Sequence, residues 1–237
     1  MPFCKTIVHI VQPGDSFYRL AQRYQTTIPE IILRNPGVDP YNLQVGTRLS
    51  ICSGQDQNTA QRDEVEVNND MRKAWQQHVY WTRMLMTSLL NDLKDQEATE
   101  KRLMRTPAGI ADVFDRFYDK AIVAQLRQLL EEHTRIGGEI IRATKEGGVQ
   151  AADELERQWY QNADQIAKLL SSINTDYSYD ELHRALTQHL EMLKQQLTAS
   201  INQEYDEAVG IFDEGEKQIL ELADYLTEGL LKQFYRS

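Results

Sequence analysis

The fold of the N-terminal part is decided by residues 6–17, which read TIVHIVQPGDSF. The first seven of them are rich in β-branched side chains, and the Pro-Gly pair that follows predicts a strand that ends in a turn. Asp15 or Ser16 can then cap a helix over residues 17–24, where apolar side chains recur at spacings of three and four. This stretch therefore predicts a strand, a turn and a short helix.

The next residues predict a second helix and a second strand. Residues 27–30 read TIPE, a capping box in which Thr27 is the N-cap and Glu30 follows three residues later, and proline is tolerated in a first helical turn. The NPG sequence at 35–37 stops this helix. Residues 47–51, TRLSI, alternate as a strand does. The predicted order is β-α-α-β.

Four motifs in this part resemble the LysM family, in family order and at family spacing. They are HIVQPGDSF at 9–17, LAQRY at 20–24, IILRNP at 31–36 and LQVGTRL at 43–49. The resemblance covers about residues 6–52. It implies a βααβ module that binds glycans containing N-acetylglucosamine, such as peptidoglycan or chitin.

The resemblance also implies a shallow glycan groove between the loop after the first strand and the loop after the second helix. Its walls would be Gly14, Asp15, Ser16 and Phe17 on one side and Leu33, Arg34, Asn35, Pro36, Gly37 and Val38 on the other. The family more often has threonine and leucine where Ser16 and Phe17 stand. Turn backbone groups can bind the amide of an acetamido sugar while an apolar residue covers its methyl group. The alternative is that Asp15 only caps a helix and Phe17 only fills the core.

The two cysteines flank the predicted strands. Cys4 precedes the first strand and Cys52 follows the second. If the strands pair antiparallel, as the family fold implies, the two thiols come within disulfide range. The alternative is a pair of free thiols in a reducing cytosol.

Composition changes after the first fifty residues. Five of the six prolines precede residue 55, and residues 1–54 hold five basic and three acidic groups, whereas the remainder holds 21 basic and 33 acidic groups. The polar residues between these parts have no apolar periodicity, which is typical of a linker. We therefore predict a LysM domain at 1–53, a linker at 54–67 and a helical domain at 68–237, an α+β protein overall.

The remainder shows a hydrophobic period near 3.6 residues. We expect long amphipathic helices over 69–95, 120–145 and 150–173, one or two short helices over 99–118 broken near Pro107, and a helical stretch over 177–234 that folds back between about 199 and 215. Short loops join these elements. The economical arrangement is an antiparallel bundle of four or five helices.

Three histidines fall on apolar stripes of different predicted helices. They are His78, His133 and His189, and carboxylates approach them in the last helix at Asp213 and its neighbours. Three imidazoles and one carboxylate would form a transition-metal site, the only cofactor that the sequence suggests. The alternative is that each histidine is a buried, hydrogen-bonded core residue.

Charge and hydropathy exclude several classes of protein. A net charge of −10 argues against binding nucleic acid by phosphate neutralisation. No run approaches the roughly 20 apolar residues of a membrane-spanning helix. The first residues lack a basic stretch followed by an apolar core, so we expect no signal peptide.

The helical part resembles an uncharacterised helical family of Gram-positive spore formers. The motifs are WQQHVYWTR at 75–83, WYQNAD at 159–164 and ADYLTEG at 223–229. An N-terminal LysM module without a signal peptide also resembles proteins placed on the developing spore from the mother-cell side. This resemblance implies a location in the cell wall or spore envelope, with the cytoplasm as the alternative.

The sequence thus supports three hypotheses. The first is a non-catalytic protein whose LysM module binds peptidoglycan or another N-acetylglucosamine polymer and tethers the acidic bundle to it. The second is a wall-associated enzyme whose bundle holds a histidine-bound metal. The third is a structural bundle that forms a homo-oligomer. No nucleophile-base pair, phosphate loop or paired-carboxylate motif stands out.

Overall fold

The structure is a computed structural model that describes residues 6–40, 42–52 and 54–235 of the 237-residue chain. Residues Val67–Phe234 form one compact unit, which we call the helical unit. The described residues before Val67 belong to a second unit, which we call the N-terminal unit. Within the described ranges, no helix combines the length and the apolar character needed to cross a membrane.

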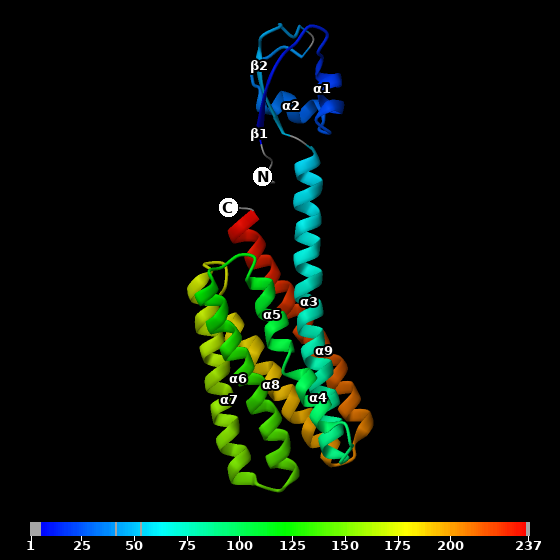
Figure 1. The fold of residues 1–237 in the computed structure, drawn as a ribbon, viewed down its shortest axis with the longest axis vertical. Coiled ribbons are helices and arrows are strands. Elements are labelled where there is room, and N and C mark those ends of the chain that lie inside the picture. Colours follow the sequence, from blue (N-terminus) through cyan, green and yellow to red (C-terminus); the bar gives the residue numbers. More distant parts are fainter. Residues whose placement is uncertain (1–5, 41, 53, 236–237) are drawn as a thin grey trace. The chain divides into compact units, whose positions relative to one another are not determined.

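The N-terminal unit has the predicted β-α-α-β order (Figure 1). Its elements are β1 (Thr6–Ile10), α1 (Phe17–Arg23), α2 (Ile28–Arg34) and β2 (Arg48–Cys52). The two strands pair antiparallel, with Thr6 opposite Cys52 and Ile10 opposite Arg48. The α+β class is therefore confirmed.

Both short helices begin at the predicted N-caps. The Ser16 hydroxyl accepts a hydrogen bond from the backbone N–H of Arg19, and Thr27 accepts one from that of Glu30. Such caps satisfy donors that the first helical turn leaves free. The helices and the sheet enclose one small core, made of Val11, Phe17, Leu20, Ala21, Ile31, Leu49 and Ile51.

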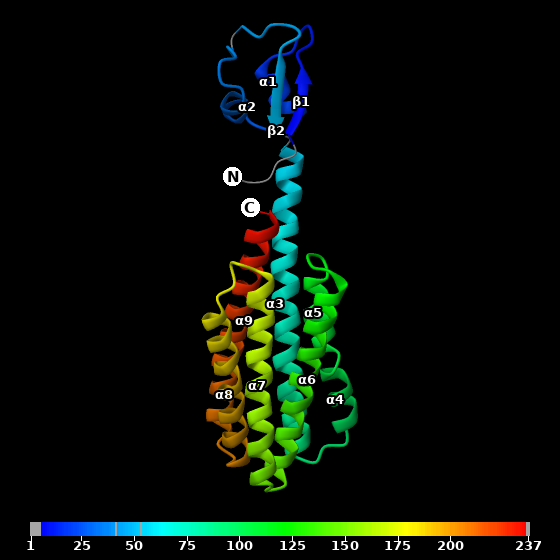
Figure 2. The same ribbon diagram turned by 90° about the vertical axis from the view of Figure 1, so that its left-hand side faces the viewer.

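The rest of the described chain is helical (Figures 1 and 2). Its elements are α3 (Gly54–Leu90), α4 (Gln96–Leu103), α5 (Thr106–Phe114), α6 (Lys120–Lys145), α7 (Val149–Ile173), α8 (Tyr179–Ile201) and α9 (Tyr205–Tyr235). Both views show α6 and α7 side by side as a hairpin, with α8 packed beside α7. The expected all-helical character of this part is confirmed.

Most helix boundaries lie where the hydrophobic period places them. Helix α6 has the predicted bounds, and the last stretch folds back at residues 202–204, inside the predicted range. Pro107 lies in the first turn of α5, so the break between the short helices comes just before it.

The first long helix differs from the prediction. It begins at Gly54 instead of near Asn69, and it ends at Leu90 instead of near Asp95. Residues 54–67, predicted as a linker, are thus helical. Neither proline nor glycine occurs between residues 55 and 106, so nothing in this polar stretch interrupts a helix even though it lacks an apolar stripe.

One close approach in the helical unit requires a glycine. The ring of Tyr177 lies against Gly229 of α9, and a Cβ atom at position 229 would lie 2.0 Å from Cε1 of that ring. The Tyr177 hydroxyl donates a hydrogen bond to the Leu226 carbonyl at 2.5 Å. Tyr177 is only 4% exposed, so this contact fixes the chain before α8 against α9.

Candidate functional site

The loop between β1 and α1 is organised around Asp15. One of its carboxylate oxygens, Oδ2, accepts hydrogen bonds from the backbone N–H of Gln12 at 2.8 Å and from Nε2 of His9 at 2.7 Å. The other, Oδ1, lies 3.5 Å from a guanidinium nitrogen of Arg23. Gly14, with φ of +89°, makes the turn that brings these groups together.

These contacts favour the ionised form of Asp15. The Gln12 backbone N–H has the largest effect, and together with His9 it holds the pKa of the Asp15 carboxyl below its ordinary value. The carboxylate is therefore a fixed acceptor that shapes the loop. Asp15 does not cap α1, because Ser16 holds that position.

His9 extends this network to α1. Its Nδ1 lies 2.8 Å from the hydroxyl of Tyr24, so the imidazole bridges Tyr24 and Asp15. The sequence analysis did not identify this bridge. The sequence does place His9 and Asp15 on the two sides of one Pro-Gly turn, which could have indicated a contact between them. A single histidine inside a predicted strand, however, belongs to no spacing pattern that predicts such a contact.

Phe17 lies in the core and not on the groove surface. Its side chain is 3% exposed and packs with Leu20 and Ile31. Val38, from the opposite wall of the predicted groove, packs against the same core cluster. The two loops therefore rest on one shared core, and Phe17 supports the groove instead of covering a sugar.

Asn35 is also a structural residue. Its Nδ2 donates hydrogen bonds to the carbonyls of Ile31 at 2.7 Å and Ser50 at 2.9 Å, and its Oδ1 accepts one from the Ser50 N–H at 2.7 Å. The side chain is 8% exposed, with its polar atoms engaged. It ties the end of α2 to β2 and is not available to a glycan.

The exposed members of the predicted groove are Gly14, Leu33, Pro36 and Gly37. Leu33 is 72% exposed although it is a large apolar residue. Its neighbour Arg34 is half-buried and pairs with Glu30 at 2.6 Å. Gly37 has a φ of +92° and open space where a side chain would be. The exposed members of the predicted groove are thus one apolar side chain, two turn glycines and a proline.

The predicted disulfide remains a prediction, because Cys4 lies outside the described residues. Cys52 is fully buried at the end of β2 and pairs in register with Thr6. No cysteine in the described part of the chain is a free thiol.

The predicted metal site does not form among the described residues, where no group of three or more His, Cys, Asp and Glu side chains could hold a metal ion. His78 and His189 are close, with ring centroids 5.9 Å apart. His133, however, bonds through Nδ1 to Oδ1 of Asn162 at 2.9 Å, and Asp213 is exposed on α9. The stripes place the histidines inside the unit, but they do not aim their nitrogens at one point.

All three histidines are buried, but only His78 and His133 have the hydrogen bonds that the alternative expects. Burial lowers the pKa of His78 to about 3 and that of His133 to about 4, and it lowers the pKa of His189 well below its ordinary value. His78 bonds through Nδ1 to the Thr106 hydroxyl at 3.1 Å. Nε2 of His189 has no partner among the described residues.

Comparison with protein families identifies the N-terminal unit. Residues 9–51 match the LysM domain, which supports the four motifs quoted above. The match supports binding to glycans that contain N-acetylglucosamine and an association with the cell wall. Searches of curated proteins and of solved structures found no match. The family match ends before α3, so the resemblance of the helical unit to a spore-former family stays a prediction.

Proposed function

We propose that this protein is a non-catalytic binder of peptidoglycan that tethers its acidic helical unit to the cell wall or spore envelope. The single observation that carries the proposal is the LysM match over residues 9–51, which coincides with the folded N-terminal unit. The unit offers an exposed apolar side chain, Leu33, and turns that are exposed at Gly14 and Gly37. Such a surface suits a neutral sugar and needs no catalytic group.

The metal-enzyme hypothesis is not retained. It required His78, His133, His189 and Asp213 to form one ligand set, and no group of three or more such ligands able to hold a metal ion occurs among the described residues. What the tethered unit contributes is its charge, because the chain after residue 54 has 33 acidic and 21 basic groups. A tethered acidic bundle would give the glycan surface a layer of negative charge.

Sedimentation of the full-length protein with insoluble peptidoglycan tests this function. We expect the protein to be retained and to be released by soluble N-acetylglucosamine oligomers. Failure of correctly folded protein to bind either material would contradict the proposal.

The variant Leu33→Ser tests the location of the groove. Burying about 40 Å² of apolar side chain contributes about 1 kcal/mol, so the variant should bind about fivefold more weakly. Val8→Ser is the matched control, because Val8 is 52% exposed on β1, outside both loops. Equal losses in the two variants would show that the groove is elsewhere.

A further inference from the structure

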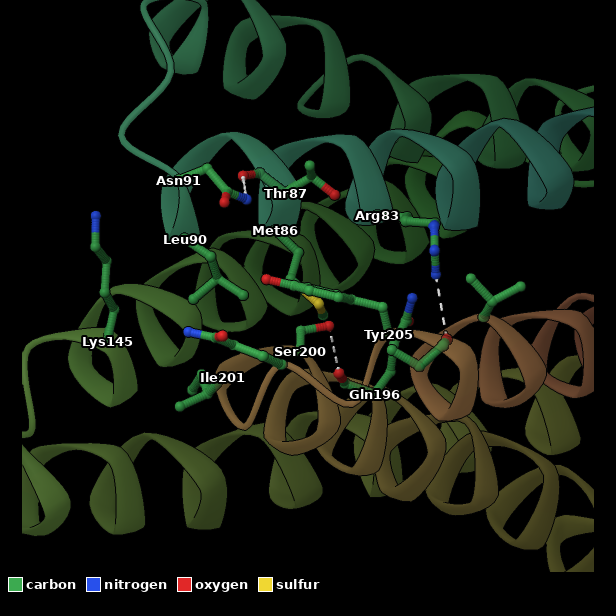
Figure 3. A pocket seen from close by; sticks show the side chains of 13 residues that line it. Arg83, Met86, Thr87, Leu90, Asn91, Lys145, Gln196, Ser200, Ile201 and Tyr205 are labelled. Carbon is green, nitrogen blue, oxygen red and sulfur yellow. Dashed lines mark hydrogen bonds between the residues drawn. The ribbon is translucent and has the colours of Figure 1, made fainter.

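We infer that a pocket in the helical unit binds small organic carboxylates that also carry hydroxyl or amide groups. The pocket lies where the ends of α3, α6 and α8 meet the start of α9, and its volume is about 370 Å³ (Figure 3). We call it the α3–α8 pocket. Pockets that bind small molecules have volumes of this order. The inference does not depend on the LysM assignment, because every lining residue belongs to the helical unit.

The charge of the pocket is opposite to that of its surroundings. Two cationic side chains, Arg83 and Lys145, line it, and no carboxylate is among the lining residues. The part of the chain after residue 54 has an excess of acidic groups. Asp206 and Glu207 follow in the first turn of α9, but they do not line the pocket. The lining therefore favours a negatively charged group.

Most N–H donors of the Arg83 guanidinium have no partner among the described residues. Its guanidinium donates one hydrogen bond to the Ala208 carbonyl at 3.3 Å and lies 4.6 Å above the ring of Phe212. It forms no ion pair with any carboxylate in the described part of the chain. Lys145, in contrast, pairs with Asp92 and donates to the Leu89 carbonyl. Because a guanidinium has five N–H donors and binds carboxylates in a fork, Arg83 is the anchor for the anionic group.

Gln196 supplies an unused amide inside the pocket. The residue is 3% exposed and lines the pocket, and its side-chain amide bonds to no described residue. The amide is not among the buried polar atoms that lack a partner, so it is open to the solvent of the pocket, where a ligand can bond to it. The Ser200 hydroxyl donates to the Gln196 backbone carbonyl at 2.7 Å, which leaves its own oxygen free to accept.

Tyr205 and the apolar lining define the body of the ligand. In Figure 3 the ring of Tyr205 extends across the pocket toward Met86 and Leu90 of α3, which also line the pocket. An aromatic face beside apolar side chains suits a sugar ring or an acyl group. A ligand with a carboxylate for Arg83, an amide for Gln196 and a ring for Tyr205 matches every part of the pocket.

The probe is N-acetylmuramic acid, which carries a carboxylate, an acetamido group and a sugar ring. Its neutral counterpart is N-acetylglucosamine, which lacks the carboxylate. The experiment follows the backbone amide chemical shifts of the full-length protein by NMR during titration with each sugar. Chemical-shift changes in residues 6–52 report binding to the LysM module, and changes in residues 83–91 and 196–209 report binding to the pocket. We expect N-acetylmuramic acid to shift the second set, with a Kd of about 1 mM.

Variants separate the pocket from the groove. Arg83→Gln should weaken this binding at least about fivefold, and Tyr205→Ser should weaken it as well. The Tyr205→Ser variant should still fold, because Tyr205 is 60% exposed and its truncation leaves the core intact. Arg135→Gln is the control, since Arg135 pairs with Glu139 and is not among the lining residues.

Three results would overturn the inference. They are no shift in the pocket residues at about ten times the expected Kd, equal shifts with the neutral sugar, and an Arg83→Gln variant that folds and binds as well as the original chain. Loss of binding to peptidoglycan with the pocket shifts retained would refute only the proposed function.

Discussion

At the scale of single residues, Asn35 shows how a polar side chain can hold a small domain together. It follows α2 directly and bonds to both main-chain groups of Ser50 in β2. The backbones of a helix end and a strand do not pair with each other in a regular pattern. The Asn35 side chain links them instead. Its side chain is not available to a glycan, yet it fixes the segment that contains Leu33 and Gly37, two members of the proposed groove.

We predict that Asn35→Ala destabilises the N-terminal unit by about 2 kcal/mol, because it leaves the partly buried Ser50 N–H and carbonyl without their Asn35 partner. Amide hydrogen exchange in β1 and β2 of the full-length protein measures the effect. Asn42→Ala, at an exposed position of the same unit, should leave the protection unchanged. Unchanged protection in Asn35→Ala would show that these bonds contribute little.

At the scale of elements, α9 is shaped by one small residue. Gly229 receives the ring of Tyr177, and burial raises the pKa of the Tyr177 hydroxyl well above its ordinary value. That hydroxyl therefore stays a hydrogen-bond donor to the Leu226 carbonyl. A glycine inside a helix costs about 1 kcal/mol, and this contact offsets that cost.

We predict that Gly229→Ala destabilises the helical unit by about 2 to 3 kcal/mol, because its methyl group would overlap the Tyr177 ring. Urea unfolding followed by far-UV circular dichroism measures it. Gly215→Ala in the same helix is the control, because a Cβ atom there meets nothing within 4 Å, and it should stabilise the helix by up to about 1 kcal/mol. Similar changes in both variants would contradict a specific fit at Gly229.

The elements also show what a sequence can predict. The stripe in residues 120–145 predicts α6 with its bounds, because one face of that helix packs on the core. The start of α3 was not predicted, because its first residues are polar and show no hydrophobic period from which a helix could be recognised.

The sites are predicted less completely than the elements. Motif spacing located both LysM loops, but it could not distinguish exposed Leu33 from buried Phe17 and Asn35, since a family motif contains core and surface residues alike. The stripes correctly placed three histidines inside the helical unit. A metal site also requires that each helix be rotated about its axis, and shifted along it, so that the histidine nitrogens point at one metal ion. Hydrophobic periodicity predicts neither the rotation nor the shift, and no such site occurs among the described residues.

At the scale of the whole molecule, the buried histidines make the helical unit sensitive to acid. Their folded-state pKa values are lowered, so the unfolded chain binds protons first as the pH falls. The stabilisation is therefore complete above about pH 6.5 and is lost as the pH falls from there toward about 4 for His133 and about 3 for His78.

We predict that protonation linked to His78 and to His133 each reduces the free energy of unfolding by about 2 to 3 kcal/mol between pH 7 and pH 4.5, at 1.36 kcal/mol per pKa unit. Urea unfolding at several pH values measures the slope. His78→Gln should make the slope shallower by about one proton. A slope that is the same in His78→Gln as in the original chain would contradict this account.

The indole rings give this unit a built-in optical reporter. The chain has three tryptophans, all of them in the helical unit, and two lie against buried histidines, Trp159 at 5.3 Å from His133 and Trp75 at 6.2 Å from His78 between ring centroids. Excitation near the red edge of protein absorbance consequently illuminates the helical unit alone. The emission of these indoles can therefore follow the acid unfolding of this unit without any attached dye.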